Sequence, residues 1–252
     1  WVFGITIVLV IISSFGLLQV KKEAFIVDDL PKKDKLYTDL KWFEQNAGGV
    51  MPLEIVIDSK KKNGLTKSLK PLEKIDELDY FLQEQPELGK PLGLLDGIKF
   101  AKQAFYDGDS LAYAIPTGTE MAFIAPYLSG ANAKANTSNP TQLLSKFIDK
   151  EKRATRVSVN MKDIGSAKLP AFLNKLDSAT KLIFDSSKYD IKITGSSVTF
   201  LEGSNFIIRG LGESIFWAFL LIAICMIFLF RSFPILMCSL IPNIVPLLIT
   251  AG

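Results

Sequence analysis

The positions of the charges constrain the fold of this chain most strongly. Residues 1–20 carry no charge, and residues 198–252 carry four charged side chains: Glu202, Arg209, Glu213 and Arg231. Charged side chains are costly inside a bilayer or a dry core, so long uncharged stretches are typical of membrane-spanning or deeply buried helices. All other charges lie in residues 21–197, which have the mixed composition of a soluble domain. The sequence therefore predicts one polar domain between two apolar ends.

The first apolar stretch is long enough to cross a membrane. Residues 1–20 read WVFGITIVLVIISSFGLLQV. A helix of this length spans about 30 Å, which is the thickness of the hydrocarbon layer. A truncated signal peptide is the alternative, although its apolar core would be unusually long and no small-x-small cleavage site precedes Lys21. We interpret residues 1–20 as a first transmembrane helix.

A second and a third apolar stretch follow the polar domain. Residues 198–230 predict a helix that enters the membrane, since IFWAFLLIAICMIFLF at residues 215–230 has no charge until Arg231. A buried core helix is the alternative, but another apolar run, residues 234–252, follows after a short turn at residues 231–233. We expect a hairpin of two transmembrane helices, with the polar domain on the side opposite the turn. Charge alone leaves the orientation open.

A polar stripe precedes the second predicted span. Glu202, Asn205, Arg209 and Glu213 are spaced by three and four residues, so they share one side of a helix. We interpret this stripe as a solvated face at the membrane border. The alternative is a contact with a second copy of the domain or with a substrate groove.

The third apolar stretch contains two internal prolines. Pro242 and Pro246 each remove a backbone donor, so the carbonyl groups that they free need other partners. Asn243 can supply such a hydrogen bond inside a helix bundle. The alternative is a kinked packing helix without direct contact to a substrate. Arg231 marks the turn between the two spans, and the candidate functional positions of the membrane region are Arg209, Glu213, Arg231, Pro242, Asn243 and Pro246.

The polar domain contains one pattern twice. Residues 52–59 alternate like a strand, and residues 68–85 place aliphatic side chains on one helical face. The pattern returns as a strand over residues 156–163, a helix over 166–184 and a closing element over 189–197. Two β-α-β units can share one sheet as a split β-α-β arrangement with both helices on one face. Two unrelated pieces are the alternative.

Shorter signals mark the connections within this domain. Residues 91–99, PLGLLDGIK, predict a strand or a turn, and Ser68 and Ser166 are the expected N-caps of the two helices. The small and polar residues 129–142 predict a loop, and this loop contains a glycosylation sequon at Asn136.

Several classes of function are excluded by composition. The chain has no His, and both cysteines, Cys225 and Cys238, lie in the apolar C-terminal region. The commonest general base and transition-metal ligand is therefore absent, and a disulfide-stapled domain is excluded. A net charge of +3 indicates no nucleic-acid partner. We predict that the chain is not an enzyme and has no catalytic residue, no cofactor and no bound metal.

The order of the elements resembles a known family. One span, a large domain of β-α-β units and a membrane hairpin are similar to the first part of resistance-nodulation-division superfamily exporters. The resemblance is to the branch of lipid and hydrophobe exporters that includes the large mycobacterial membrane proteins. The matching stretches are LFRS at residues 229–232, IPNIVP at 241–246, PLEIVID at 52–58 and ITGSSV at 193–198.

This resemblance implies a fold class, a location and a function. The class is an α-helical membrane protein with an α+β extracytoplasmic porter-like domain of split β-α-β units. The location is the bacterial cytoplasmic (inner) membrane, where this chain would be the N-terminal fragment of a multi-pass transporter whose proton-relay acids lie outside residues 1–252. The implied function is proton-motive-force-driven export of lipids or other hydrophobic molecules. The implied partners are a lipid-like substrate, the lipid bilayer and the remaining spans of the same transporter, and a homo-oligomer is left open.

Two other functions stay open. One is the permease of an ATP-driven lipoprotein or macrolide exporter, although such permeases usually have a longer link than RSFP between these spans. The other is a membrane-anchored sensor or assembly protein with a ligand-binding loop. In an exporter, the aromatic residues of the domain would line an apolar substrate groove or belong to the ordinary core; the candidates are Phe105, Tyr106, Tyr113, Phe123 and Tyr127.

Overall fold

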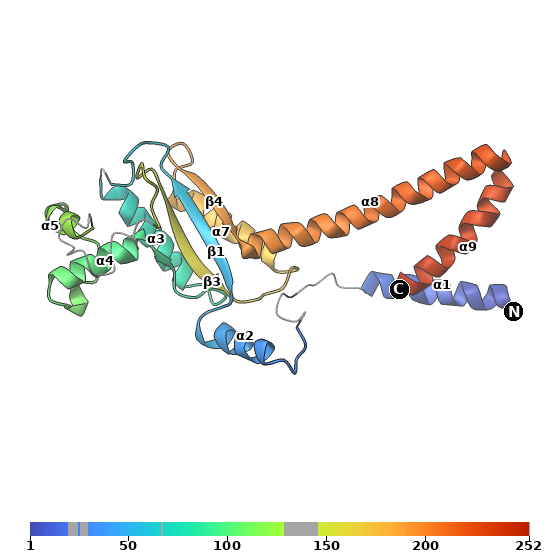
Figure 1. The fold of residues 1–252 in the computed structure, drawn as a ribbon, viewed down its shortest axis with the longest axis horizontal. Helices are drawn as coiled ribbons and strands as arrows, with labels where there is room; N and C mark the ends of the chain where they lie inside the picture. The colour runs from blue at the N-terminus through green and yellow to red at the C-terminus, as the bar shows by residue number, and fades with distance from the viewer. Residues whose placement is uncertain (20–24, 26–29, 67, 129–145, 252) are drawn as a thin grey trace. The chain divides into compact units, whose positions relative to one another are not determined.

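The chain forms two compact units. The computed structural model describes residues 1–19, 25, 30–66, 68–128 and 146–251. Ala24–Leu201 form an α+β unit, and Trp1–Glu23 together with Glu202–Gly252 form an apolar helical unit. The elements are α1 (Val2–Gln19), α2 (Lys35–Asn46), β1 (Met51–Asp58), α3 (Lys70–Gln83), β2 (Leu92–Gly93), α4 (Leu94–Phe105), the short 3-10 helix η2 (Ser110–Ala112), α5 (Gly118–Leu128), β3 (Ala154–Met161), α7 (Leu169–Ile183), β4 (Asp190–Gly195), α8 (Ser196–Phe230) and α9 (Phe233–Ala251) (Figure 1).

One antiparallel sheet organises the α+β unit. The strand order is β2-β3-β1-β4, so β1 lies between β3 and β4, and Ile55 pairs with both Val157 and Ile193. Side chains along a strand alternate between its two faces. Leu53, Ile55 and Ile57 of β1 are accordingly fully buried, whereas the residues between them are half-buried. One face of the sheet therefore carries the core.

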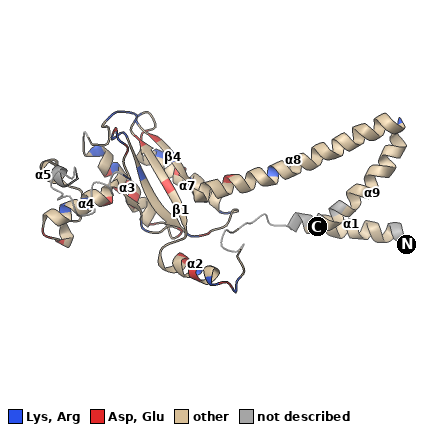
Figure 2. Cartoon of the chain, viewed as in Figure 1, with Lys and Arg blue, Asp and Glu red and all other residues tan. Residues whose placement is uncertain are grey.

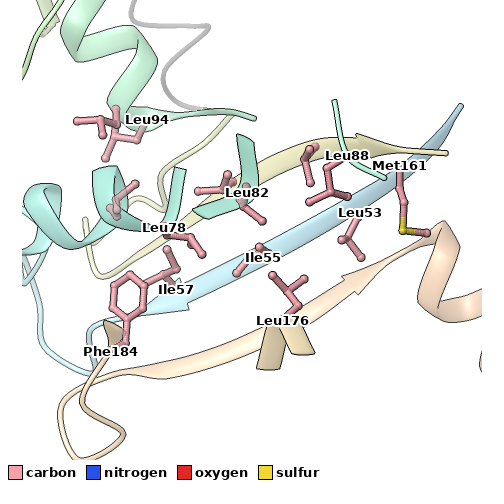
Figure 3. Close-up of a cluster of buried hydrophobic side chains, with 14 of the residues drawn as sticks. Leu53, Ile55, Ile57, Leu78, Leu82, Leu88, Leu94, Met161, Leu176 and Phe184 are labelled. Carbon is pink, nitrogen blue, oxygen red and sulfur yellow. The ribbon is translucent and has the colours of Figure 1, made fainter. Parts of the chain in front are cut away.

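Helices α3 and α7 cover this face. Each follows one strand in the chain, α3 after β1 and α7 after β3, and both contribute buried residues to the same core. Figure 3 shows Leu78 and Leu82 of α3 and Leu176 of α7 in one cluster with Leu53, Ile55 and Ile57 of β1. Burying one such side chain contributes about 1.5–3 kcal/mol. The core thus depends on periodic aliphatic residues in two helices and two strands.

The start of α8 belongs to the α+β unit. Gly195 ends β4 with a φ of +119°, and a Cβ at this position would lie 2.5 Å from the carbonyl oxygen of Pro52. Only glycine fits there without a backbone shift. The hydroxyl of the buried Ser197 donates to the same oxygen over 3.3 Å, and Leu201 packs in the core. These contacts fix the first turns of α8 on the domain.

The apolar unit contains α1, the rest of α8 and α9. Helices α1 and α9 contact each other, and the buried hydroxyl of Ser13 donates to the carbonyl of Ile249 over 3.4 Å. Helix α8 ends at Phe230 and α9 begins at Phe233, so two residues connect them. Figure 2 shows that the described charged residues are frequent in the α+β unit and sparse along these three helices.

The predicted fold class is wrong. That class was an α-helical membrane protein with an α+β porter-like domain of split β-α-β units. The structure instead has eight described α-helices and one four-stranded antiparallel sheet, and within the described residues α8 is the one helix long and apolar enough to cross a membrane. A multi-pass α-helical class therefore does not hold.

The error has a physical cause. The apolar stretches of α1 and α9, Gly4–Gly16 and Phe233–Pro246, are each shorter than 18 residues. At about 1.5 Å per residue, such stretches fall short of the ~30 Å hydrocarbon layer. The sequence reasoning counted the whole uncharged stretches 1–20 and 234–252 as spans, whereas the apolar helices among the described residues are shorter, and so it overestimated the number of spans.

Local boundaries also differ from the expectation. Ser68 and Ser166 are not the N-caps; α3 has Leu69 and α7 has Lys168 at that position, and neither cap makes a side-chain hydrogen bond. Both helices carry proline at the first or second position, where proline lacks the N–H that a cap would satisfy. The expected loop at residues 129–142, with its sequon at Asn136, lies outside the described residues.

Candidate functional site

The membrane-region candidates on α8 do not form a site. Arg209 and Glu213 both lie on α8 and are exposed, and within the described residues no ion pair joins them. Arg231 lies between α8 and α9 with a φ of 49°, and its N–H donates to the carbonyl of Ile227 over 2.8 Å. This residue therefore ends one helix immediately before the next.

The polar candidate on α9, Asn243, makes its hydrogen bond within its own helix. Pro242 and Pro246 lie inside α9 and are exposed. The side-chain amide of Asn243 donates to Ser239 one turn earlier over 3.1 Å, and the hydroxyl of Thr250 donates to Pro246 over 2.9 Å. Within the part of the chain that the structure describes, no hydrogen bond or ion pair links these residues to Arg209 or Glu213. The six candidates are therefore not brought together.

Exposed aromatic side chains gather instead on α4 and α5 of the α+β unit. The rings of Phe105 and Phe123 stack with centroids 6.4 Å apart, and the ring of Tyr106 meets Phe105 edge-on at 5.3 Å. All three side chains are exposed, Phe123 by 64%. We call these three residues the α4–α5 aromatic cluster. Phe100 and Leu111, on α4 and η2, are exposed as well.

These positions include three of the five aromatic candidates from the sequence. Phe105, Tyr106 and Phe123 lie at the surface rather than in the core, and Tyr113 is half-buried. The side chain of Tyr127 lies outside the described residues. The structure therefore brings part of the predicted group together on one surface.

Glu120 links Tyr106 of the aromatic cluster to the start of α5. Its carboxylate accepts hydrogen bonds from the N–H of Thr117 at 2.7 Å and the hydroxyl of Tyr106 at 2.9 Å, and it pairs with Lys102 at 3.0 Å. These contacts, the backbone N–H of Thr117 foremost, lower the pKa of Glu120 to about 2. The hydrogen bond to Glu120 in turn raises the pKa of Tyr106. The bonds tie α4 to the start of α5 through one carboxylate that stays ionised.

A buried acidic group lies between α3 and α4. Asp79 on α3 is 4% exposed, and its Oδ1 atom is fully buried without a hydrogen-bond partner. Burial, followed by the charges of Asp96 and Asp76 and opposed by the charge of Lys99, raises the pKa of Asp79 to about 7. An unpartnered buried carboxylate is costly, so the protonated form is favoured.

The neighbours of Asp79 form one polar cluster. Asp96 on α4 accepts from the N–H of Gly93 at 2.8 Å and from the hydroxyl of Tyr113 at 2.9 Å. Burial, followed by the bond to Asp96, raises the pKa of Tyr113 to about 12. Lys99 donates to Asp76, and its ammonium lies 5.9 Å from the centroid of the Tyr113 ring. We call Asp76, Asp79, Asp96, Lys99 and Tyr113 the Asp79 cluster.

The Asp79 cluster can bind or release a proton near neutral pH. Among the described residues, no group of three or more Asp, Glu or Cys side chains is arranged to hold a metal ion. The sequence reasoning missed this cluster, but part of the signal was present. Asp79 follows Leu72 and Ile75 at helical spacing on the face of α3 that enters the core. A lone acid on an apolar face indicates a neutral or paired carboxyl.

Comparisons with known proteins add no relative. The chain matches no protein-family model and no curated protein.

Proposed function

We propose that this chain is a membrane-attached part of a system that exports lipids or other hydrophobic molecules. In this proposal α8 crosses a bacterial cytoplasmic membrane and the α+β unit handles the substrate. The observation that carries the proposal is the α4–α5 aromatic cluster, which exposes stacked rings in the same chain as an apolar helix of membrane-spanning length.

Helix α8 supports the membrane attachment. It has 35 residues with an apolar segment of mean hydropathy 2.4, none of which is buried inside the structure. At 1.5 Å per residue its length is about 52 Å, which exceeds the ~30 Å hydrocarbon layer. The excess covers the polar stripe that includes Arg209 and Glu213, which would lie at the membrane border.

The aromatic cluster supports an apolar substrate. Single exposed apolar side chains are normal, but adjoining ones mark interaction sites. The ring of Phe105 contacts those of Tyr106 and Phe123, and Glu120 orients Tyr106 through its hydroxyl. Covering one ring with an acyl chain would contribute about 1.5–3 kcal/mol. Because the rings are already ordered, little conformational entropy is lost on binding.

Lipid photocrosslinking tests this proposal. The chain is reconstituted in liposomes that contain a photoactivatable lipid, and labelled peptides are mapped by mass spectrometry. We expect labelling of α4 and α5 in addition to α8, and a severalfold loss in α4 and α5 in the double variant Phe105→Ser/Phe123→Ser. Leu182→Ser is the control, since Leu182 is 89% exposed on α7, away from the cluster in sequence. Labelling confined to α1, α8 and α9 would contradict the proposal.

The energy source is a separate part of the proposal. The resemblance to resistance-nodulation-division exporters implies that a proton gradient drives transport. Transfer of a fluorescent lipid to acceptor vesicles is measured with and without an imposed pH gradient. Equal lipid transfer with and without the gradient would reject this energy source. The crosslinking result would still identify the substrate class.

A second candidate is a membrane-anchored sensor of pH. Asp79 favours it, because a buried carboxyl with a pKa near about 7 changes charge in the physiological range. Near-ultraviolet circular dichroism of the full chain would follow the surroundings of Tyr113. A transition with a midpoint near neutral pH that disappears in Asp79→Asn supports the sensor, and a spectrum that is constant over this range rejects it.

A further inference from the structure

Helix α2 exposes apolar side chains that the α+β unit leaves uncovered. No residue of α2 is buried, and Leu36, Trp42 and Phe43 are exposed by 53%, 59% and 51%. Leu36, Leu40 and Phe43 follow one another at spacings of four and three residues, so they form one stripe along the helix. Trp42 is about 100° around the helix from Phe43, and its ring meets that of Phe43 edge-on at 5.4 Å.

A different side of α2 is attached to the domain. Glu44 accepts a hydrogen bond from the N–H of Asp163, just after β3, over 3.0 Å, and it pairs with Lys41 at 2.9 Å. The side chain of Glu44 is accordingly only 13% exposed. Glu44 is about 80° around the helix from Leu36 and about 100° from Phe43. Leu36 and Phe43 are therefore left free when Glu44 is bound, whereas Leu40, one turn before Glu44, is half-buried.

Basic residues stand at the beginning of α2. Lys32, Lys33 and Lys35 are exposed, and within the described residues none of them is in an ion pair. The acid among them, Asp34, is the N-cap and accepts from the N–H of Leu36 over 3.0 Å. Asp39 is exposed on the helix. Three lysines without ion pairs therefore lie just before α2 and at its first residue, next to the start of the apolar stripe.

We propose that α2 lies in the interface of a bilayer that contains anionic lipids. Leu36, Trp42 and Phe43 enter the boundary between headgroups and acyl chains, and Lys32, Lys33 and Lys35 contact the headgroups. This combination of an apolar stripe, a tryptophan and basic residues is how helices lie in a membrane interface. The unpaired lysines favour anionic lipids over a second copy of the chain, because that copy would bring the same positive charge.

The tryptophan content of the chain allows a direct test. The chain has three tryptophans, Trp1, Trp42 and Trp217, so Trp1→Phe/Trp217→Phe leaves Trp42 as the only one. This variant of the full chain is placed in liposomes of phosphatidylglycerol and phosphatidylcholine that carry brominated acyl chains. We expect a blue-shifted Trp42 emission and quenching that is strongest for bromines close to the headgroups. Trp1→Phe/Trp42→Phe leaves Trp217 on α8 as the matched control.

The outcomes separate this inference from the proposed function. Quenching of both Trp42 and Trp217 supports the interfacial role of α2 and the membrane attachment through α8. Quenching of Trp217 alone overturns the interfacial role of α2 and leaves the membrane attachment through α8 in place. Quenching of Trp42 alone supports the interfacial helix and contradicts a membrane-spanning α8.

Two variants examine the parts of α2 separately. Both variants are made in the Trp42-only chain. The triple variant Lys32→Ser/Lys33→Ser/Lys35→Ser is expected to reduce quenching severalfold in anionic liposomes. The double variant Leu36→Ser/Phe43→Ser is expected to remove most of the quenching. Leu182→Ser on α7 is the control and should leave quenching unchanged. Equal quenching in purely neutral liposomes would overturn the anionic contact. A blue shift that rises with protein concentration without lipid would show that a second copy covers the stripe, and would also overturn the proposal.

Discussion

Helices α2 and α3 are similar in length and both amphipathic, yet they differ in what their apolar sides meet. Helix α3 buries Leu72, Ile75, Leu78 and Leu82 against the sheet, whereas α2 buries no residue at all. Helices α4 and α5 lie between these cases, because they bury Ile98 and Ile124 but expose Phe105 and Phe123. An amphipathic pattern therefore predicts that a helix has a partner surface, but not whether that surface belongs to the same chain.

The largest expected effect tests the buried side of this comparison. Ile55→Ala removes a fully buried side chain from the central strand, which should lower the free energy of unfolding of the α+β unit by about 2–5 kcal/mol. Denaturant unfolding of the full chain, followed by the emission of Trp42, measures this loss. A loss no larger than that of Leu182→Ala, whose side chain is exposed on α7, would show that Ile55 is not part of a packed core.

The next effect concerns the polar group on the buried face of α3. The pKa of Asp79 is raised from 3.8 to about 7, so the folded state holds a proton that the unfolded state releases between these values. The stabilisation that comes from this proton is fully present below about pH 4 and is lost as the pH rises toward about 7. The free energy of unfolding should fall by at most about 4 kcal/mol over this range. Asp79→Asn should remove this pH dependence. Parallel stability curves for both proteins from acid to alkaline pH would contradict the raised pKa.

A smaller loss of stability is expected from the hydrogen bond between Tyr113 and Asp96 in the Asp79 cluster. Tyr113→Phe removes the hydroxyl that donates to Asp96 over 2.9 Å, and a lost hydrogen bond costs about 0.5–1.5 kcal/mol. Because the ring is kept, the change isolates the bond from the packing. The thermal midpoint of unfolding measures the loss, with Tyr80→Phe as the control on an exposed tyrosine of α3. Equal midpoints for the two variants would mean that the bond contributes nothing.

The smallest effect is expected on the exposed side. Phe123→Ser removes a side chain that is 64% exposed, and surface substitutions usually change stability by no more than about 0.5 kcal/mol. Its effect should instead appear in lipid labelling of α4 and α5. A loss of stability as large as that of Ile55→Ala would place Phe123 in the core and remove the basis for a binding surface.

The strands and helices that face the core were readable from the sequence. The alternation over residues 52–59 appears as β1, and the periodicity over residues 68–85 appears as α3. Helix α4 was missed because PLGLLDGIK combines a strand-like start with glycines, and its start depends on the bond between Asp96 and the N–H of Gly93. The membrane class failed because each uncharged stretch was counted as a full span, whereas among the described residues α8 is the one helix with a long enough apolar segment.

The candidate site was less accessible to sequence reasoning. The position of Asp79 on an apolar helical face was visible, but its neighbours Asp96 and Tyr113 come from α4 and the segment after η2. Only the packing of α3 against α4 brings these groups together. The membrane-region candidates, by contrast, were selected for residue type and position along apolar stretches, and the structure gives Asn243 a partner within its own helix.

The strand order also dictates when the domain can form during synthesis. Strand β1 lies in the middle of the sheet, but its partners begin at Ala154 and Asp190, far along the chain. At about 5–20 residues per second, the roughly 100 residues that separate β1 from β3 take ~5–20 s to synthesise. During that time Leu53, Ile55 and Ile57 have no strand to pair beside them. Folding is therefore governed by distant contacts, which are slow to form, and the nascent β1 stays unpaired until they are made.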